Sequence, residues 1–88
     1  MIDFQAQFET AAKDVQSLAK KPDDQSMLKL YGLYKQATVG DVQGSRPGFS
    51  DFAGRFKYDA WAKLKGTSSE DAMQKYIDLV GQLKVKYG

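Results

Sequence analysis

The chain contains neither cysteine nor histidine among its 88 residues. Without cysteine it can form no disulfide and offers no thiolate metal ligand, and without histidine it lacks the commonest general base and nearly every type of zinc site. The Ser-His and Cys-His pairs that activate nucleophiles are excluded for the same reason. Carboxylates, lysines and tyrosines remain, but this composition disfavours an enzyme, and we expect no catalytic residue, no metal site and no cofactor.

Long apolar runs are also missing. No stretch approaches the ~20 apolar residues that a membrane-spanning helix needs. The first five residues, Met-Ile-Asp-Phe-Gln, lack the positive charge and the apolar core of a signal peptide. Together with the absence of cysteine, these features predict a soluble protein of the cytoplasm.

A strong excess of one charge is absent as well, because thirteen basic residues are interleaved with eleven acidic ones and the formal net charge is +2. Duplex-binding proteins usually concentrate basic residues in a stripe, so we expect no nucleic-acid partner. The balance fits a weakly basic pocket for one anionic ligand. The length fits one small domain and is too short for two, so residues 1–88 are interpreted as a single domain. No apolar surplus suggests more than a monomer, which is the default expectation.

Apolar residues recurring at steps of three and four predict two helices in the first half of the chain. The first covers residues 4–18 and is expected to stop at the lysine pair before Pro22, because proline pushes the preceding residue out of the helical region. Asp23 or Asp24 is expected to cap the second helix, and Gly40 to end it.

The same spacing predicts two more helices in the second half. The third is expected to be capped by Ser50 or Asp51 and closed by Gly66. The sequence Thr67-Ser-Ser-Glu70 matches a capping box, in which the threonine and the glutamate satisfy each other's backbone N–H groups. It should open the fourth helix, which runs to Tyr87. The predicted fold class is therefore all-α, with four helices.

Residues 40–50, between the second and third helices, contain three glycines and a proline without an apolar period, which indicates a loop. Helix–helix connections are usually about 2–8 residues long, so this loop is unusually long. Fully extended it could span about 36 Å, against about 22 Å for a 15-residue helix. It can therefore carry the chain back along the second helix, which allows the second and third helices to run parallel.

The segment Tyr31-Gly-Leu-Tyr-Lys-Gln-Ala-Thr-Val-Gly-Asp41 is the most informative part of the chain. Residues three and four apart share a helical face, so Tyr31, Tyr34 and Lys35 can project into the same volume. A phenol ring can stack on a base, a hydroxyl can donate to an oxygen, and a lysine supplies charge for a phosphate. The combination suits a phosphorylated, nucleotide-like ligand. Tyrosines at this spacing more often line a core, which is the alternative.

In this segment and beyond it, the chain resembles the acyl-CoA-binding protein family, in order and over essentially its whole length. The further matching motifs are Arg46-Pro-Gly48, Lys57-Tyr-Asp-Ala-Trp61, Lys65-Gly-Thr-Ser68, Glu70-Asp-Ala-Met73 and Tyr76. The resemblance implies an up-down-down-up four-helix bundle with a long crossover loop between helices 2 and 3. It also implies non-catalytic binding, and transport or buffering, of medium- to long-chain fatty acyl-CoA esters.

The resemblance also implies roles for individual residues. Tyr34 resembles the ring that stacks on the adenine, and Tyr31, Lys35 and Lys57 resemble the contacts to the ribose 3′-phosphate. The other ligand-binding positions that it implies are Ala12, Gln16, Met27, Leu28, Gly32, Leu33, Ala53 and Tyr76. Among them, Ala12 resembles a position where a small side chain is needed, and Met27 and Leu28 resemble apolar positions beside the adenine and the acyl chain.

The sequence departs from the family at Gln16 and Ala53, where many members carry a lysine or an arginine, and at Tyr58, where tryptophan is common. These departures leave the affinity and the preferred chain length open. Two other functions also stay open at this point. The chain could be a helical module that binds protein partners through a lysine-rich surface, or a nucleotide- or RNA-binding bundle with a steep salt dependence. A carrier could also make transient contact with membranes or with acyl-CoA-using enzymes.

Several conspicuous residues need no part in a ligand site. Phe8, Trp61, Val80 and Leu83 are expected to belong to the core, and Arg46-Pro-Gly48 is better explained by loop geometry. Exposed lysines of the fourth helix, Lys75, Lys84 and Lys86, are expected to face solvent.

Overall fold

The computed structural model describes residues 3–88, so Met1 and Ile2 of the N-terminal segment considered above lie outside the described residues. The elements are, in order, α1 (Phe4–Asp14), a 3₁₀ turn η1 (Val15–Ser17), α2 (Asp24–Thr38), α3 (Phe52–Ala62) and α4 (Ser69–Tyr87). This part of the chain contains no strand, which confirms the all-α prediction. None of its helices is both long enough and apolar enough to cross a membrane.

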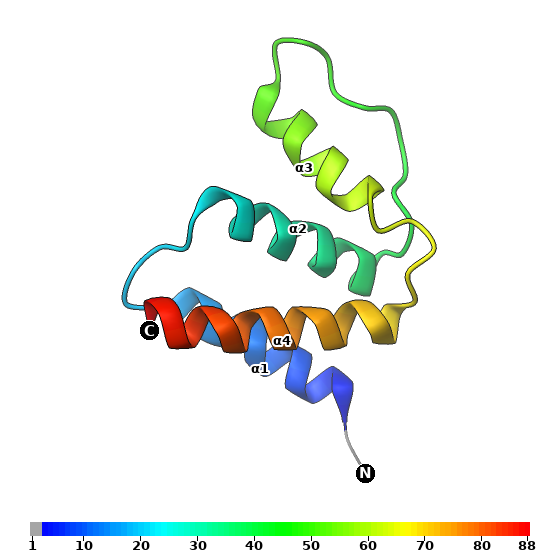
Figure 1. Cartoon of the computed structure of the whole chain (residues 1–88). Coiled ribbons are helices and arrows are strands. Elements are labelled where there is room, and N and C mark those ends of the chain that lie inside the picture. Colours follow the sequence, from blue (N-terminus) through cyan, green and yellow to red (C-terminus); the bar gives the residue numbers. More distant parts are fainter. Residues whose placement is uncertain (1–2) are drawn as a thin grey trace.

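The helices form a bundle in which α2 packs against both α3 and α4, and α1 packs against α4 (Figure 1). Helices α2 and α4 run in opposite directions, and the long loop after α2 returns the chain so that α3 follows the same general direction as α2. The up-down-down-up arrangement is therefore confirmed. Within residues 3–88, α3 packs on the rest of the bundle through α2 alone. Among the helices, α2 is therefore the one that positions the residues of α3.

Each helix begins at a polar side chain that accepts a hydrogen bond from a backbone N–H group in the first turn, as helix N-caps generally do. Asp23 accepts from the N–H of Ser26, and Asp51 accepts from the N–H of Gly54. Both caps were among those predicted for these helices. Asp3 plays the same role at the start of α1.

Two predicted helix boundaries were wrong. The first α-helix ends at Asp14, and the chain tightens into a 3₁₀ turn before Leu18 becomes extended, well ahead of Pro22. This tighter turn still packs Val15 and Leu18 against the core. The cap of α4 is Ser68, which accepts from the N–H of Asp71, so the capping box does not start at Thr67.

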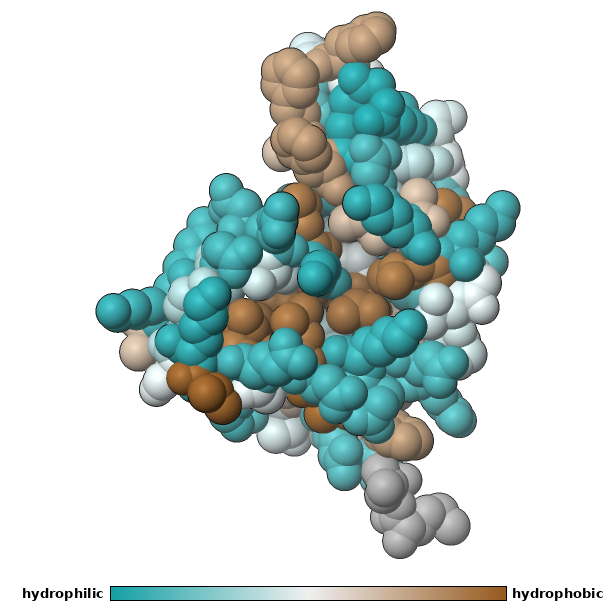
Figure 2. Space-filling view, in the orientation of Figure 1, coloured by the Kyte–Doolittle hydropathy of each residue, from teal (hydrophilic) through white to brown (hydrophobic). Residues whose placement is uncertain are grey.

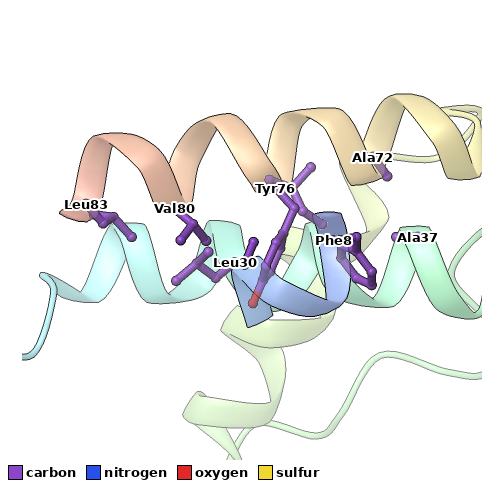
Figure 3. Close-up of a cluster of buried hydrophobic side chains, with 9 residues drawn as sticks. Phe8, Leu30, Ala37, Ala72, Tyr76, Val80 and Leu83 are labelled. Atoms are coloured by element: carbon purple, nitrogen blue, oxygen red, sulfur yellow. The ribbon is translucent and has the colours of Figure 1, made fainter. Parts of the chain in front are cut away.

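The main core lies between α1, α2 and α4 (Figure 3). Its buried members are Phe8, Ala11, Leu30, Leu33, Ala37, Ala72, Tyr76, Val80 and Leu83. Alanines, larger aliphatic side chains and aromatic rings together fill this space, as in the close-packed interiors of folded domains. Trp61 is also buried but lies outside this cluster, and its indole Nε1 donates to the carbonyl of Gly40 at 2.7 Å. The core assignments of Phe8, Val80 and Leu83 are confirmed.

A polar network fastens the end of α2 to the turn between α3 and α4. Gln36 is fully buried, and its Nε2 donates to the Asp41 carboxylate at 2.9 Å and to the Thr67 carbonyl at 2.8 Å. The Asp41 carboxylate also accepts from the N–H of Gly66 at 2.8 Å. Ser69 adds a hydrogen bond from its hydroxyl to the carbonyl of Ala37. This network fixes where the long loop leaves α2 and where α4 begins.

The Asp41 carboxylate should make the stability of the fold sensitive to acid. Its hydrogen bonds from the Gly66 N–H and from Gln36 lower the pKa of Asp41 below its ordinary value of 3.8. The folded state therefore favours the ionised form, and this contribution is lost as the pH falls through the lowered pKa. We expect the unfolding free energy from urea titrations to fall more steeply below about pH 4 in the wild type than in Asp41→Asn. Equal slopes would contradict this role.

Candidate functional site

A hollow of about 510 Å³ opens on the side of the bundle where the α1–α2 connection crosses α2 and α4. We call it the first hollow. Its lining residues are Val15, Gln16, Leu18, Lys20, Lys21, Pro22, Met27, Leu30, Tyr31, Tyr34 and Tyr76. Five of these were predicted site residues, namely Gln16, Met27, Tyr31, Tyr34 and Tyr76. Residues that the sequence could assign only one by one are therefore brought together in space.

The floor of the first hollow meets an aromatic cluster contributed by three helices. Phe8 from α1 stacks on Tyr34 from α2, with ring centroids 5.4 Å apart, and meets Tyr76 from α4 edge-on at 5.0 Å. Offset and edge-on pairs of this kind are the favoured aromatic geometries. Figure 3 shows Phe8 and Tyr76 side by side, with the Tyr76 hydroxyl pointing away from α4. The cluster holds the Tyr34 ring against the bundle while 44% of that side chain stays exposed.

The hydroxyl groups of the three tyrosines at the first hollow have no hydrogen-bond partner among residues 3–88. The two other tyrosines behave differently, because Tyr58 donates to the Gly44 carbonyl at 3.0 Å and Tyr87 donates to the Asp23 carboxylate at 3.2 Å. Burial raises the pKa of Tyr76, and the nearby Tyr34 raises it further, so the Tyr76 hydroxyl stays protonated at neutral pH. The hollow therefore presents phenol groups that remain available as donors to a ligand.

Two lysines lie over aromatic rings at the contact between α2 and α3. Lys57 of α3 places its Nζ 5.7 Å from the centre of the Tyr31 ring. Lys35 of α2 places its Nζ 5.2 Å from the centre of the Trp61 ring. A cation held near a ring face is stabilised by the ring quadrupole. Tyr31 and Lys57 thus come together as predicted, whereas Lys35 points toward α3 and does not line the first hollow.

A second hollow of about 680 Å³ lies between α2 and α3. Its lining includes two predicted residues, Leu28 and Leu33, together with Phe56, Ala60 and Leu64, and its outer residues are Gln25, Lys29 and Lys63. Because Met27 lines the first hollow and Leu28 the second, adjacent positions of α2 reach both. The side of α2 that lines the second hollow is more apolar than the side that lines the first.

A third hollow, of about 570 Å³, adjoins the aromatic cluster between α1 and α2. It holds the predicted residues Ala12 and Gln16 beside Tyr34. The remaining predicted residues lie elsewhere. Gly32 is buried where α2 meets α3, and Ala53 is exposed in the first turn of α3. Neither lines any of these three hollows, and the closeness of the Ala60 carbonyl gives Gly32 a packing role.

The sequence interpretation did not include Phe8, Lys20 and Lys21 among the site residues. Phe8 was assigned to the core, and it is both a core residue and the partner of Tyr34 and Tyr76. The two lysines were used only as a helix stop, but both line the first hollow. Their adjacency in a short connection, facing a tyrosine-rich helix, was the signal that could have found them.

Comparisons with known proteins identify the family of the chain. Residues 5–80 match the family model described as acyl CoA binding protein. A relative from Drosophila melanogaster, an acyl-CoA-binding protein homolog, is 51% identical over 81 residues, which are 92% of this chain and 94% of the relative.

Two solved structures extend the comparison. The crystal structure of Oryza sativa acyl-CoA-binding protein 2 has a TM-score of 0.90 at 43% identity and covers 94% of this chain and 90% of its own. The solution structure of the yeast acyl coenzyme A binding protein has a TM-score of 0.73 at 51% identity, covering 91% and 93%. The sequence, the helical bundle and the grouped site residues lead to one conclusion: this chain belongs to the acyl-CoA-binding protein family.

Proposed function

We propose that the chain binds medium- to long-chain fatty acyl-CoA esters without reacting with them, and carries or buffers them in the cytoplasm as a monomeric single domain. Membership of the family implies acyl-CoA as the ligand. The absence of histidine and cysteine disfavours chemistry on the thioester. Neither a protein-interaction module nor an RNA-binding bundle receives comparable support.

The observation that carries the proposal is the set of phenol hydroxyls without partners among residues 3–88, at a hollow that Lys20 and Lys21 also line. Tyr31, Tyr34 and Tyr76 present their hydroxyls at the first hollow, and Lys57 lies over the Tyr31 ring. A phenol hydroxyl with no partner inside the protein can donate a hydrogen bond to a ligand. An anionic nucleotide supplies both the acceptors for the phenols and the charge for the lysines.

Within this arrangement we assign separate roles to the neighbouring groups. The exposed part of the Tyr34 ring is proposed to stack on the adenine, because Phe8 stacks on this ring within the bundle and holds it in place. Tyr31 and Lys57 are proposed to hold the 3′-phosphate, with Lys35 moving from its position over Trp61 to join them. Each of these lysines leaves only a weak cation–π contact, worth about 0.5–1 kcal/mol at exposed sites.

The fatty acyl tail is proposed to lie against the apolar side chains of α2. Met27 and Leu28 are neighbours on this helix and line the first and second hollows respectively. A tail that follows this route remains in contact with apolar surface as it passes from one hollow toward the other. Each methylene removed from water contributes about 0.8 kcal/mol.

The phosphate assignment is tested by calorimetry with dodecanoyl-CoA and its 3′-dephospho analogue. Removing Lys57 as Lys57→Ala is expected to weaken binding of dodecanoyl-CoA about tenfold, since a hydrogen bond to a charged group contributes about 1.5–3 kcal/mol. The same variant should bind the dephospho analogue as the wild type does, because the phosphate that Lys57 contacts is missing.

A matched control is Lys75→Ala, which removes an exposed lysine of α4 that lines none of the hollows described above. It should leave the affinity for both ligands unchanged. If Lys57→Ala weakened the binding of both ligands equally, Lys57 would not contact the 3′-phosphate. If the wild type bound neither ligand, the proposed function itself would be wrong.

A further inference from the structure

An aromatic row at the start of α3 lies outside the main core. Phe49, Phe52 and Phe56 expose 83%, 67% and 59% of their side chains. Phe52 and Phe56, four residues apart, lie on one side of α3, and Phe49 lies in the turn just before this helix. Phe49 and Phe52 line none of the three hollows, whereas Phe56 lines the second. We call this set the phenylalanine row.

The position of α3 makes the row accessible. Helix α3 packs on α2 alone among the described helices, and its first turns and the preceding loop extend away from the rest of the bundle (Figure 1). Figure 2 shows light brown side chains along the outer edge of this region, beside hydrophilic residues. Exposed apolar patches with a polar rim mark interaction sites on soluble domains.

Positive charge accompanies the row. The Arg55 guanidinium lies 4.8 Å from the centre of the Phe49 ring. Residues 40–66 contain five basic and three acidic side chains, while the rest of the chain contains eight of each, so this segment carries the whole net charge of +2. Of the three acidic groups, Asp51 caps α3, Asp41 belongs to the polar network at the end of α2 and Asp59 pairs with Arg46. Among residues 3–88, Arg55, Lys57 and Lys63 form no ion pair.

We propose that the phenylalanine row docks α3 onto the surface of an anionic phospholipid membrane. Aromatic rings favour the boundary between headgroups and acyl chains, and neighbouring cations are attracted to anionic lipids. The row has both properties in one short segment. The inference concerns a surface outside the first hollow, although Phe56 also lines the second hollow, toward which the acyl tail is proposed to pass.

The area of the row argues against a second copy of the chain as the occupant. Aromatic side chains bury about 150–250 Å² each, so three partly exposed rings offer roughly 400 Å². A stable protein interface buries about 800 Å² on each partner. A membrane needs no such complementary surface, because lipids adapt to the inserted rings.

The test is cosedimentation of the ligand-free protein with vesicles. The wild type is expected to partition onto vesicles of phosphatidylcholine and phosphatidylserine at least about fivefold better than onto pure phosphatidylcholine, as one lysine or arginine near an anionic surface contributes about 1 kcal/mol. Phe49→Ser/Phe52→Ser should reduce partitioning onto the anionic vesicles about tenfold, since burial of each ring is largely lost. Arg55→Gln should reduce it about fivefold.

The control is Val85→Ser, which removes a 91% exposed apolar side chain on α4 and should partition as the wild type does. Circular dichroism and calorimetry with dodecanoyl-CoA on the same variants separate this proposal from folding and from the proposed function. Equal partitioning of the wild type and Phe49→Ser/Phe52→Ser would overturn the proposal, as would no binding to either vesicle. A phenylalanine-dependent dimer, or a loss of acyl-CoA affinity without a loss of partitioning, would assign the row to another occupant.

Discussion

Gly32→Ala is expected to destabilise the fold by about 2 kcal/mol, although alanine is the better helix former. A Cβ atom at this position would lie 2.7 Å from the carbonyl oxygen of Ala60 and 2.9 Å from its carbonyl carbon. These are backbone atoms of α3, so they cannot move aside as the end of a flexible side chain can. Either α2 and α3 separate or the helices distort, and both lose packing. The midpoint of thermal unfolding should fall by about 10 °C.

The matched control is Gly81→Ala, on the exposed side of α4. A Cβ atom at Gly81 would meet nothing within 4 Å. Both glycines lie inside helices, so the gain in helix propensity is the same, about 0.5–1 kcal/mol. We expect Gly81→Ala to stabilise the fold by that amount and Gly32→Ala to destabilise it. Stabilisation by both substitutions would show that α3 is not held tightly against α2.

The effect at Gly32 should extend to ligand binding, because the contact between α2 and α3 also positions Lys57 over Tyr31. The resemblance to the family placed Gly32 among the ligand-binding residues. The structure gives a reason for a glycine there that requires no contact with a ligand, namely the close approach of the Ala60 carbonyl. A loss of acyl-CoA affinity in Gly32→Ala would therefore follow from a displaced α3.

Local sequence rules were sufficient for most helix boundaries and failed where distant residues decide them. Thr67 and Ser68 are both able to cap a helix. The buried Gln36, 31 residues earlier, takes the carbonyl of Thr67 as an acceptor, and Ser69 donates to the carbonyl of Ala37. These contacts fix the chain before α4, and the cap falls one residue later than predicted. No local pattern contains that information.

The loop of residues 40–50 shows the same difference between what local sequence predicts and what distant contacts decide. The length of residues 40–50 was enough to predict that the chain returns along α2. It gave no indication that Arg46 would pair with Asp59 through two hydrogen bonds of 2.9 and 2.8 Å. The interpretation of Arg46-Pro-Gly48 as a structural feature remains compatible with this ion pair, which joins the loop to α3. Exposed pairs of this type contribute about 0–1 kcal/mol.

For the candidate site, helical spacing predicted that Tyr31, Tyr34 and Lys35 share a face of their helix. It did not predict which residues of other helices they contact. Tyr31 and Tyr34 do line one hollow, but Lys35 turns toward Trp61 and the Tyr34 ring packs on Phe8. The two contacts reach across to other helices, so they depend on how α1 and α3 pack. Tyr76 is a buried core residue whose side chain also lines the hollow.

Removing all three phenol hydroxyls at the first hollow, as Tyr31→Phe/Tyr34→Phe/Tyr76→Phe, is expected to weaken acyl-CoA binding about a hundredfold. Each hydroxyl that donates to the ligand contributes about 0.5–1.5 kcal/mol. The rings and their packing stay in place, so the unfolding free energy should not fall. Calorimetry with dodecanoyl-CoA and urea titrations on the same preparations measure the two quantities.

The two remaining tyrosines provide the control, because their hydroxyls already have partners within the protein. Tyr58→Phe/Tyr87→Phe removes the hydrogen bonds to the Gly44 carbonyl and to the Asp23 carboxylate. We expect this variant to lose about 1–2 kcal/mol of stability while its affinity for acyl-CoA stays unchanged. The triple variant should therefore change only the affinity, and the double variant only the stability. If the triple variant instead lost stability and kept its affinity, the tyrosines at the first hollow would serve the fold, and the ligand would have to bind elsewhere on the bundle.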